Sequence, residues 1–332
     1  MRTMRAVEGV LIGTAVGDAL GLPHEGLGPE RIAKRLTRGG LRHGMLGGRG
    51  LLSDDTEHAS MVARALAQSR GDVEAFARSF AAQLRRWLLS LPPGIGLATL
   101  RASVRLCLGL PPSRSGVDSA GNGPLMRAAL LGVWAEGDGQ LADLVRVSSR
   151  MTHTDPRAED GALLVARLAR QLAAGSWDLT AADEIRDPEF RARVQEAAQF
   201  EGDLQAFRVM AGFERGVSGF VVHTLPAVVW CAREPDPVAA LERAVRLGGD
   251  TDTVAAIVGA LVGARDGVQA WPTAWVEGIV DWPLRVETLS ALADALVHDR
   301  PPPSQRWVAA LPRNLALVVV IFGHLGLRAL GR

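Results

Sequence analysis

Two short stretches of the sequence place carboxylates and hydroxyls side by side, immediately before helix-like apolar runs. They are "SDDT" at 53–56 and "GGDTDT" at 248–253. Either stretch alone is typical of a helix N-terminus, because Ser or Asp caps free N–H groups and acidic residues favour the positive end of the helix dipole. One residue is enough to cap a helix, whereas each stretch offers several oxygen ligands. The repetition therefore favours a second interpretation, a metal site.

The ligand types indicate which metal such a site would take. Carboxylate and hydroxyl oxygens with no His or Cys beside them suit Mg²⁺ or Mn²⁺. If the two helix starts face each other, the sequence predicts a site for two cations.

Two other interpretations of the second stretch fit its surroundings less well. "DTDTV" at 250–254 also matches the nucleophile motif of haloacid-dehalogenase phosphatases, but that motif needs a preceding buried strand, and here a helix-like segment precedes it. An EF-hand loop is excluded, because the sixth and twelfth positions counted from Asp250 are Ala255 and Leu261 rather than Gly and Glu.

Glycine-containing loops before helices are candidates for phosphate binding, because free backbone N–H groups at a helix start attract anions. Gly94 and Gly96 lie in one such loop, and Asn122 and Gly123 lie in another. His153 precedes a third helix start and could donate to an anion. For each feature a purely structural role, as a turn or near a cap, is the alternative. Combined with the acidic stretches, these loops predict a ligand that carries both a diphosphate and a sugar diol.

The elements that must position these residues are helices. Apolar residues recur at steps of three and four in the segments 74–89, 100–110, 161–175 and 240–249. Alternating runs typical of β-strands are few, and the nearest, 219–230, contains a proline that argues against a central strand. We expect an all-α fold, with a single compact domain of orthogonal helices over 1–298. A Pro-rich break and an apolar C-terminal helix are expected over 299–332.

Glycines recur every four residues in two of the helix-like segments. They are Gly9, Gly13, Gly17 and Gly21 in the first segment, and Gly259, Gly263 and Gly267 in the second. Each glycine costs roughly 1 kcal/mol in a helix interior relative to Ala, so close helix packing should compensate. The matching spacing is compatible with a direct glycine contact between the two helices.

Composition restricts the functional class. The 332 residues are 48% hydrophobic, and 37 basic residues nearly balance 36 acidic ones. No block of like charge suggests binding to nucleic acid or to a membrane surface. Cys107 and Cys231 lie far apart in apolar surroundings. This spacing argues against zinc and iron–sulfur sites and predicts buried, reduced thiols in a cytoplasmic protein.

The apolar stretches near the two ends fit neither a targeting segment nor a clear membrane span. Glu8 and Asp18 interrupt the apolar run that a signal peptide would need. The most apolar stretch, 315–330, is shorter than the roughly 20 residues that span a membrane and contains His324 and Arg328. We expect a buried terminal helix there, with a membrane anchor as the alternative.

With these residues assembled, the chain resembles the ADP-ribosylglycohydrolases, the family of dinitrogenase-reductase-activating glycohydrolase and the animal ADP-ribosylhydrolases. Five motifs stand in the family's order, namely "GTAVGDALGLPHEG" (13–26), "SDDT" (53–56), "GNGPLMR" (121–127), "THT" (152–154) and "GGDTDTVA" (248–255). "SDDT" alone is common, whereas its combination with the third and fifth motifs is highly specific. The similarity runs from about residue 6 to residue 290.

The resemblance implies an all-α fold that holds two divalent cations, Mg²⁺ or Mn²⁺, between the two acidic motifs. The implied metal ligands are Ser53, Asp54, Asp55, Asp250, Asp252 and Thr253. Asp55, or Glu25 on a segment that matches the family's mobile entrance loop, would act as the catalytic acid or base. The residues expected to hold ADP-ribose are Gly94, Gly96, Leu97, Ser119, Asn122, Gly123 and His153. Ala120 stands where some animal members have an aromatic near adenine, so stacking would need another residue, such as Phe220.

The expected function is a metal-dependent hydrolase that cleaves the N- or O-glycosidic bond of ADP-ribose attached to a protein side chain or a small acceptor. The alternatives are a catalytically silent ADP-ribose-binding or crystallin-like member, and a Mg²⁺-dependent phosphohydrolase. Arginine, serine, a nucleobase and a small molecule all remain open as the acceptor, which depends on the cleft rim, including the expected solvated loop at 26–50. We expect a cytoplasmic monomer that acts on an ADP-ribosylated protein or a small ADP-ribose conjugate, without nucleic-acid or membrane partners.

Overall fold

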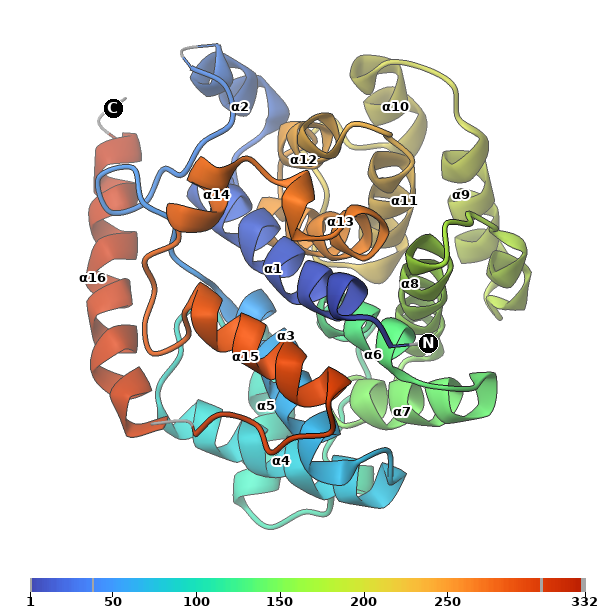
Figure 1. Ribbon diagram of the computed structural model, residues 1–332. Coiled ribbons are helices and arrows are strands. Elements are labelled where there is room, and N and C mark those ends of the chain that lie inside the picture. The colour runs from blue at the N-terminus through green and yellow to red at the C-terminus, as the bar shows by residue number, and fades with distance from the viewer. Residues whose placement is uncertain (1, 38, 305–306, 330–332) are drawn as a thin grey trace.

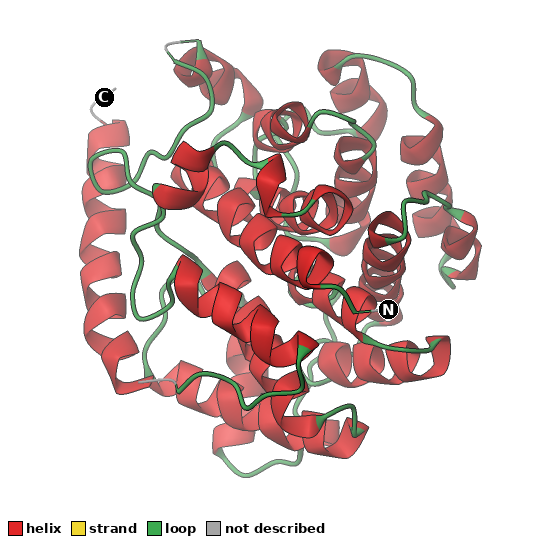
Figure 2. Ribbon diagram, viewed as in Figure 1, coloured by secondary structure: helices red, strands yellow, loops and turns green. Residues whose placement is uncertain are grey.

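The computed structural model describes residues 2–37, 39–304 and 307–329, and within these ranges the regular structure is helical, without a β-strand (Figures 1 and 2). This confirms the all-α prediction. The α-helices are α1 (Met4–Gly21), α2 (Pro29–Leu36), α3 (Asp54–Ser69), α4 (Val73–Leu89), α5 (Leu97–Cys107), α6 (Ala129–Trp134), α7 (Asp138–Arg150), α8 (Pro156–Ala173), α9 (Pro188–Gln199), α10 (Leu204–Ala211), α11 (Val221–Ala232), α12 (Pro237–Arg246), α13 (Thr251–Asp266), α14 (Thr273–Glu277), α15 (Val286–Val297) and α16 (Ala310–Ala329). Short 3₁₀ turns are η1 (Leu22–His24), η2 (Pro112–Arg114), η3 (Leu125–Arg127), η4 (Thr180–Glu184), η5 (Val268–Ala270) and η6 (Trp307–Ala309).

The centre of the molecule is the pair of helices α1 and α13, which lie side by side (Figure 1). A Cβ atom on Gly9 would collide with the carbonyl of Gly263, and one on Gly13 would collide with the carbonyl of Gly259. The glycine contact between the two helices, with which the sequence spacing was compatible, therefore exists. Close backbone packing compensates for the helix propensity that the glycines lose.

This contact places the end of α1 at the start of α13. The hydroxyl of Thr251 donates to the carbonyl of Gly21 at 2.9 Å. The chain then turns through η1 to Glu25, and Gly26 N–H donates to the carbonyl of Gly249 at 2.8 Å. The entrance segment that carries Glu25 is thus tied by its backbone to the "GGDTDT" motif.

The four periodic segments are helices, as predicted, in α4, α5, α8 and α12. The run that came nearest to a strand pattern is helix α11, with Pro226 inside it. Because α11 is buried over most of its surface, its sequence is almost uniformly apolar and carries no clear helical period.

Two local expectations were wrong. The 26–50 segment contains helix α2, which begins with Pro29 and buries Ile32 and Leu36, so it is not simply a solvated loop. Cys107 is exposed at the end of α5, whereas Cys231 is buried as expected.

The apolar C-terminal helix α16 packs on the domain by one face only (Figure 1). Arg313, Asn314 and Leu317 are buried against the body, while Val319 and Phe322 are each 70% exposed. The expectation of a buried terminal helix therefore holds for one side of the helix and fails for the other. Within the described ranges, one helical stretch, Met4–His24, is long and apolar enough to cross a membrane, and 89% of its apolar window is buried in the protein core.

Candidate active site

The two acidic motifs meet at the first turns of α3 and α13. Ser53 caps α3, and its hydroxyl lies 3.1 Å from the N–H of Asp55 and 3.0 Å from the Asp55 carboxylate. On the other side, the hydroxyl of Thr253 donates to the same carboxylate at 3.3 Å. The two helix starts therefore face each other, and Asp55 lies between them.

Burial and mutual repulsion distinguish these carboxylates from surface acids. Burial, reinforced by the neighbouring carboxylates, raises the pKa of Asp54, Asp55 and Asp252 well above the usual range. Glu25 and Asp250 are among the groups whose negative charge contributes to these shifts. A concentrated negative charge of this kind is stabilised by a bound cation.

Asp18, in the last turn of α1, orients the first acidic motif, and the sequence analysis missed this role. Its carboxylate accepts hydrogen bonds from the N–H of Ser53 at 2.9 Å, from the N–H of Thr56 at 3.2 Å and from the Thr56 hydroxyl. Burial raises the pKa of Asp18 to about 6, although these hydrogen bonds oppose the shift. The available signal was a carboxylate in the apolar C-terminal half of α1, a helix that also contains Glu8 near its start.

The oxygen donors at the two helix starts are suitable ligands for a divalent cation. Among the described residues no three Asp, Glu, His or Cys side chains form a complete cation cage by themselves. However, the Oδ1 atom of Asp55 is buried and has no hydrogen-bond partner within the described part of the chain. The hydroxyls of Ser53 and Thr253 supply further oxygen donors beside it. An all-oxygen donor set with an unpartnered carboxylate oxygen suits Mg²⁺ or Mn²⁺.

A cleft of about 520 Å³ opens over the two motifs. Five of the six predicted metal ligands line it, and the sixth, Asp55, is buried beneath them. Glu25 lies at its exposed edge. The cleft also brings together every residue predicted to hold ADP-ribose, namely Gly94, Gly96, Leu97, Ser119, Asn122, Gly123 and His153. Further lining residues that the sequence analysis did not anticipate include Val217, Ser218, Gly219, Leu317 and Ile321.

Asn122 connects the second glycine loop to the second acidic motif. Its side-chain amide donates to the Asp250 carboxylate at 2.6 Å and to the Thr224 hydroxyl at 3.0 Å. Asn122 therefore positions Asp250 in addition to lining the cleft.

Similarity to known proteins identifies the family of the chain. The family description "ADP-ribosylglycohydrolase" matches residues 1–306. The chain belongs to this family. It is 32% identical over 289 residues to an uncharacterized protein of Archaeoglobus fulgidus, covering 82% of this chain and 90% of the relative. It is 29% identical over 304 residues to the ADP-ribosyl-[dinitrogen reductase] glycohydrolase of Rhodospirillum rubrum, covering 86% of this chain and 95% of that enzyme.

A solved structure has the same fold. The "ADP-ribosylglycohydrolase-related protein complex" superimposes with a TM-score of 0.64 at 30% identity, covering 89% of this chain and 98% of that chain. Family membership supports glycohydrolase activity, and it confirms the family to which the sequence motifs pointed.

His153 lies between the two glycines of the "GNG" sequence. A Cβ atom on either Gly121 or Gly123 would lie 2.9 Å from its ring. Burial, with a contribution from Arg127, lowers the pKa of His153 to about 3. His153 is thus neutral at physiological pH, and the hydrogen-bond donor that it offers to the cleft is an uncharged N–H group.

Arg127, at the end of the "GNGPLMR" motif, sets up this histidine and is a second residue that the sequence analysis missed. Its guanidinium is buried and donates to the carbonyl of Ser148 at 2.9 Å and to the Thr152 hydroxyl at 2.7 Å. The Thr152 hydroxyl lies 2.8 Å from Nδ1 of His153. When that hydroxyl donates to Nδ1, the hydrogen of the neutral ring is on Nε2, the atom beside the glycine loop.

The aromatic substitute proposed for adenine stacking is not in the cleft. Phe220 packs beside the glycine loop, where its ring centroid is 5.2 Å from the Arg157 guanidinium carbon. It is not one of the cleft-lining residues, and Ala120 is buried behind the loop. Stacking of Phe220 on adenine therefore stays a prediction.

Proposed function

We propose that this chain is a divalent-cation-dependent hydrolase that cleaves the N- or O-glycosidic bond between ADP-ribose and an acceptor. The observation that carries the proposal is the contact of Thr253 with Asp55, which joins the two acidic motifs beneath a cleft. The same cleft contains both glycine loops and His153. Cations and phosphates could therefore be bound within reach of one ligand, as a nucleotide-sugar substrate requires.

The residues that would hold the cations are Ser53, Asp54, Asp55, Asp250, Asp252 and Thr253. When bound, Mg²⁺ or Mn²⁺ would orient and polarise the ribose hydroxyls next to the anomeric carbon. Asp18 and Asn122 hold two of these carboxylate-bearing segments in place. The chain thereby presents the ligands without a large rearrangement.

The remaining parts of the cleft would hold the diphosphate. Backbone N–H groups of the Gly94–Gly96 loop lie at the start of α5, where they can donate to phosphate oxygens. The neutral His153 would add one more N–H donor on the opposite loop. These backbone and imidazole N–H groups would bind the diphosphate as uncharged donors. They would therefore add no permanent positive charge beside the carboxylates that hold the cations.

We assign proton transfer to Glu25 rather than to Asp55. Glu25 is exposed at the cleft edge, where water and the leaving acceptor meet. Asp55 is almost fully buried and is hydrogen-bonded to Ser53 and Thr253. Glycosidic cleavage needs one carboxyl group that exchanges protons and negative charge close to the oxocarbenium-like centre. Glu25 suits the first task, and the buried carboxylates suit the second.

The test is release of free ADP-ribose from arginine-linked and serine-linked conjugates in the presence of Mg²⁺, Mn²⁺ or EDTA. The proposal predicts release that requires a divalent cation. Binding of ADP-ribose without release would favour the silent binding member, and release of inorganic phosphate would favour the phosphohydrolase. Monomeric state and cytoplasmic location stay predictions.

A further inference from the structure

Helix α16 contributes to the candidate active site although it lies beyond the part of the chain that matches the family. The family match ends at residue 306, and α16 begins at Ala310. Nevertheless Leu317 and Ile321 line the cleft over the acidic motifs. This wall is therefore a feature of this chain in addition to the shared fold.

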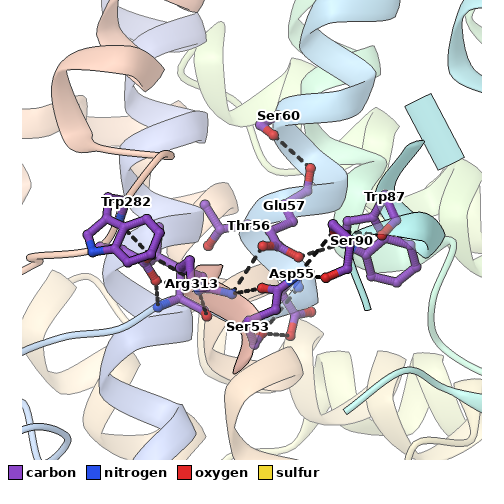
Figure 3. Close-up of polar contacts among 12 residues, drawn as sticks. Ser53, Asp55, Thr56, Glu57, Ser60, Trp87, Ser90, Trp282 and Arg313 are labelled. Carbon is purple, nitrogen blue, oxygen red and sulfur yellow. Dashed lines mark hydrogen bonds and ion pairs between the residues drawn. The ribbon is translucent and has the colours of Figure 1, made fainter. Parts of the chain in front are cut away.

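A buried arginine fixes α16 to the segment immediately before the first acidic motif. Arg313 is 6% exposed and forms an ion pair with Asp281 and another with Glu57, the latter at 3.2 Å. It also donates to the carbonyl of Leu52 at 2.6 Å, and Leu52 N–H donates to Asp281 at 2.8 Å. Figure 3 shows Arg313 at the first turn of α3, close to Glu57. A buried arginine satisfied by two carboxylates and a carbonyl defines a specific position for the helix.

Three further contacts attach α16 to the loops on either side. The amide of Asn314 donates to the carbonyl of Ser90 at 2.8 Å, and Ser90 precedes the first glycine loop. Leu317 packs in a small apolar cluster with Leu22, and His324 Nε2 lies 3.1 Å from the carbonyl of Pro23. Helix α16 thus bridges the first glycine loop and the entrance segment that leads to Glu25.

These contacts indicate which part of the substrate would meet α16. In the proposed function, the ribose hydroxyls lie at the acidic motifs and the scissile bond lies next to them. The acceptor then leaves past Glu25 and the entrance segment, which is the segment that α16 braces. His153 and the second glycine loop belong to a different part of the cleft, built from η3 and the start of α8.

We propose that α16 forms the acceptor-side wall of the cleft and that Leu317 and Ile321 limit the size of the acceptor. Arg313 is the positioning residue that holds this wall. The chain therefore selects ADP-ribose joined to a small molecule or a short flexible segment over ADP-ribose on a folded protein surface. This inference rests on the proposed hydrolase function.

The experiment compares two substrates with the same linkage, a small ADP-ribosyl conjugate and a folded ADP-ribosylated protein. The full-length wild type is measured beside the double variant Leu317→Ala/Ile321→Ala. A matched control, Leu315→Ala/Val319→Ala, removes similar side chains from the exposed face of the same helix. In the double variant, kcat/KM for the folded protein divided by kcat/KM for the small conjugate should rise by roughly tenfold. Changes of this size are typical when a few apolar groups are removed from a specificity pocket. The control should leave the ratio unchanged.

A second variant keeps the proposal testable if the double variant folds poorly. Arg313→Met retains the aliphatic stem but removes the ion pairs, so it should shift the ratio in the same direction. It should also speed proteolysis between α15 and α16, a readout that does not depend on activity. The affinity for free ADP-ribose, which has no acceptor, should stay within about twofold in the Leu317→Ala/Ile321→Ala variant and in its matched control, whereas a tenfold change would correspond to about 1.4 kcal/mol.

The outcomes separate this inference from the function beneath it. If the wild type releases ADP-ribose but the ratio is the same in all folded variants, the wall proposal is wrong and the hydrolase stands. If the wild type releases ADP-ribose from none of the conjugates, the proposed function fails and the wall proposal fails with it.

Discussion

The helix starts at Ser53 and at Asp250 offer similar oxygen ligands, but different parts of the chain hold them. The first is oriented by side chains, since Ser53 caps α3 and the Asp18 carboxylate accepts two backbone N–H groups. The second is oriented mainly by the backbone, and the Asn122 amide adds one side-chain hydrogen bond to the Asp250 carboxylate. Gly249 adopts a positive φ of 80°, and the N–H of Asp250 donates to the carbonyl of Val217 at 2.8 Å.

This difference indicates how each half of the site can fail. A side-chain scaffold is sensitive to changes of charge and hydrogen bonding in residues such as Asp18. A backbone scaffold is sensitive to added side-chain volume at its glycines and indifferent to charge. The two halves should therefore respond differently to substitutions, although both present carboxylates to the same cleft.

The largest loss of activity is expected from substitutions of the carboxylates themselves, which both halves of the site contribute. Asp252→Asn and Asp54→Asn should each reduce ADP-ribose release well beyond the roughly 10–100-fold typical of a supporting residue, because a charged ligand is lost. Thermal unfolding should change little, since burial and repulsion already raise the pKa of both groups. The control is Glu277→Gln at an exposed position of α14, which should retain full activity. Full turnover by a purified Asp252→Asn variant would exclude the two-motif site.

The backbone half is tested by Gly249→Ala. A Cβ atom at this position would collide with the carbonyl of Val217, and the positive φ is unfavourable for Ala. We expect a loss of about 2–4 kcal/mol in the free energy of unfolding, together with a loss of activity. Gly139→Ala is the matched control, because its Cβ has no neighbour within 4 Å and its φ is not positive. Denaturant unfolding of both variants measures the difference, and equal stability of the two would contradict the backbone scaffold.

The side-chain half is tested by Asp18→Asn, which keeps the shape of residue 18 and removes its charge. The amide places N–H donors opposite the N–H donors of Ser53 and Thr56, so the first acidic motif loses its orientation. Affinity for Mn²⁺ and kcat should fall by about 10–100-fold, as for other residues that support metal ligands. Stability should fall less than in Gly249→Ala, because the substitution also removes a buried charge. An unchanged Mn²⁺ titration would show that Asp18 has only a structural role.

The sequence allowed the cleft to be predicted where local patterns were strong. The acidic stretches, the glycine loops and His153 each precede a helix, and all of them line one cleft. Asp18 was missed because an isolated acid in the apolar half of a helix has no periodic pattern that identifies its partner. Arg313 was missed because its carboxylates, Glu57 and Asp281, lie far away in the sequence and only the fold brings them together.

Burial was the property least accessible from local patterns. Arg127 was quoted within a motif, but its sequence neighbours do not reveal that it is buried against Thr152. Cys107 was expected to be buried because apolar residues surround it, yet it ends a helix at the surface. In both residues the deciding factor is which face of the element meets the core, and the short helix ends carry too few periodic positions to specify it.

The smallest predicted effect is on thermal stability, because the increase in Tm that a bound cation causes should depend on pH. Burial and repulsion raise the pKa of Asp54, Asp55 and Asp252 above the value of about 3.9 in an unfolded chain. Between about pH 4 and the raised values the native state binds more protons than the unfolded state, so without cation its stability falls as pH rises. A divalent cation favours the ionised forms, so saturating Mg²⁺ should raise Tm by a few °C more at pH 8 than at pH 5. Asp252→Asn, measured in EDTA, should flatten the pH dependence because one of the raised groups is gone. A Tm shift that is larger at pH 5 would mean that the cation binds elsewhere than between the two helix starts.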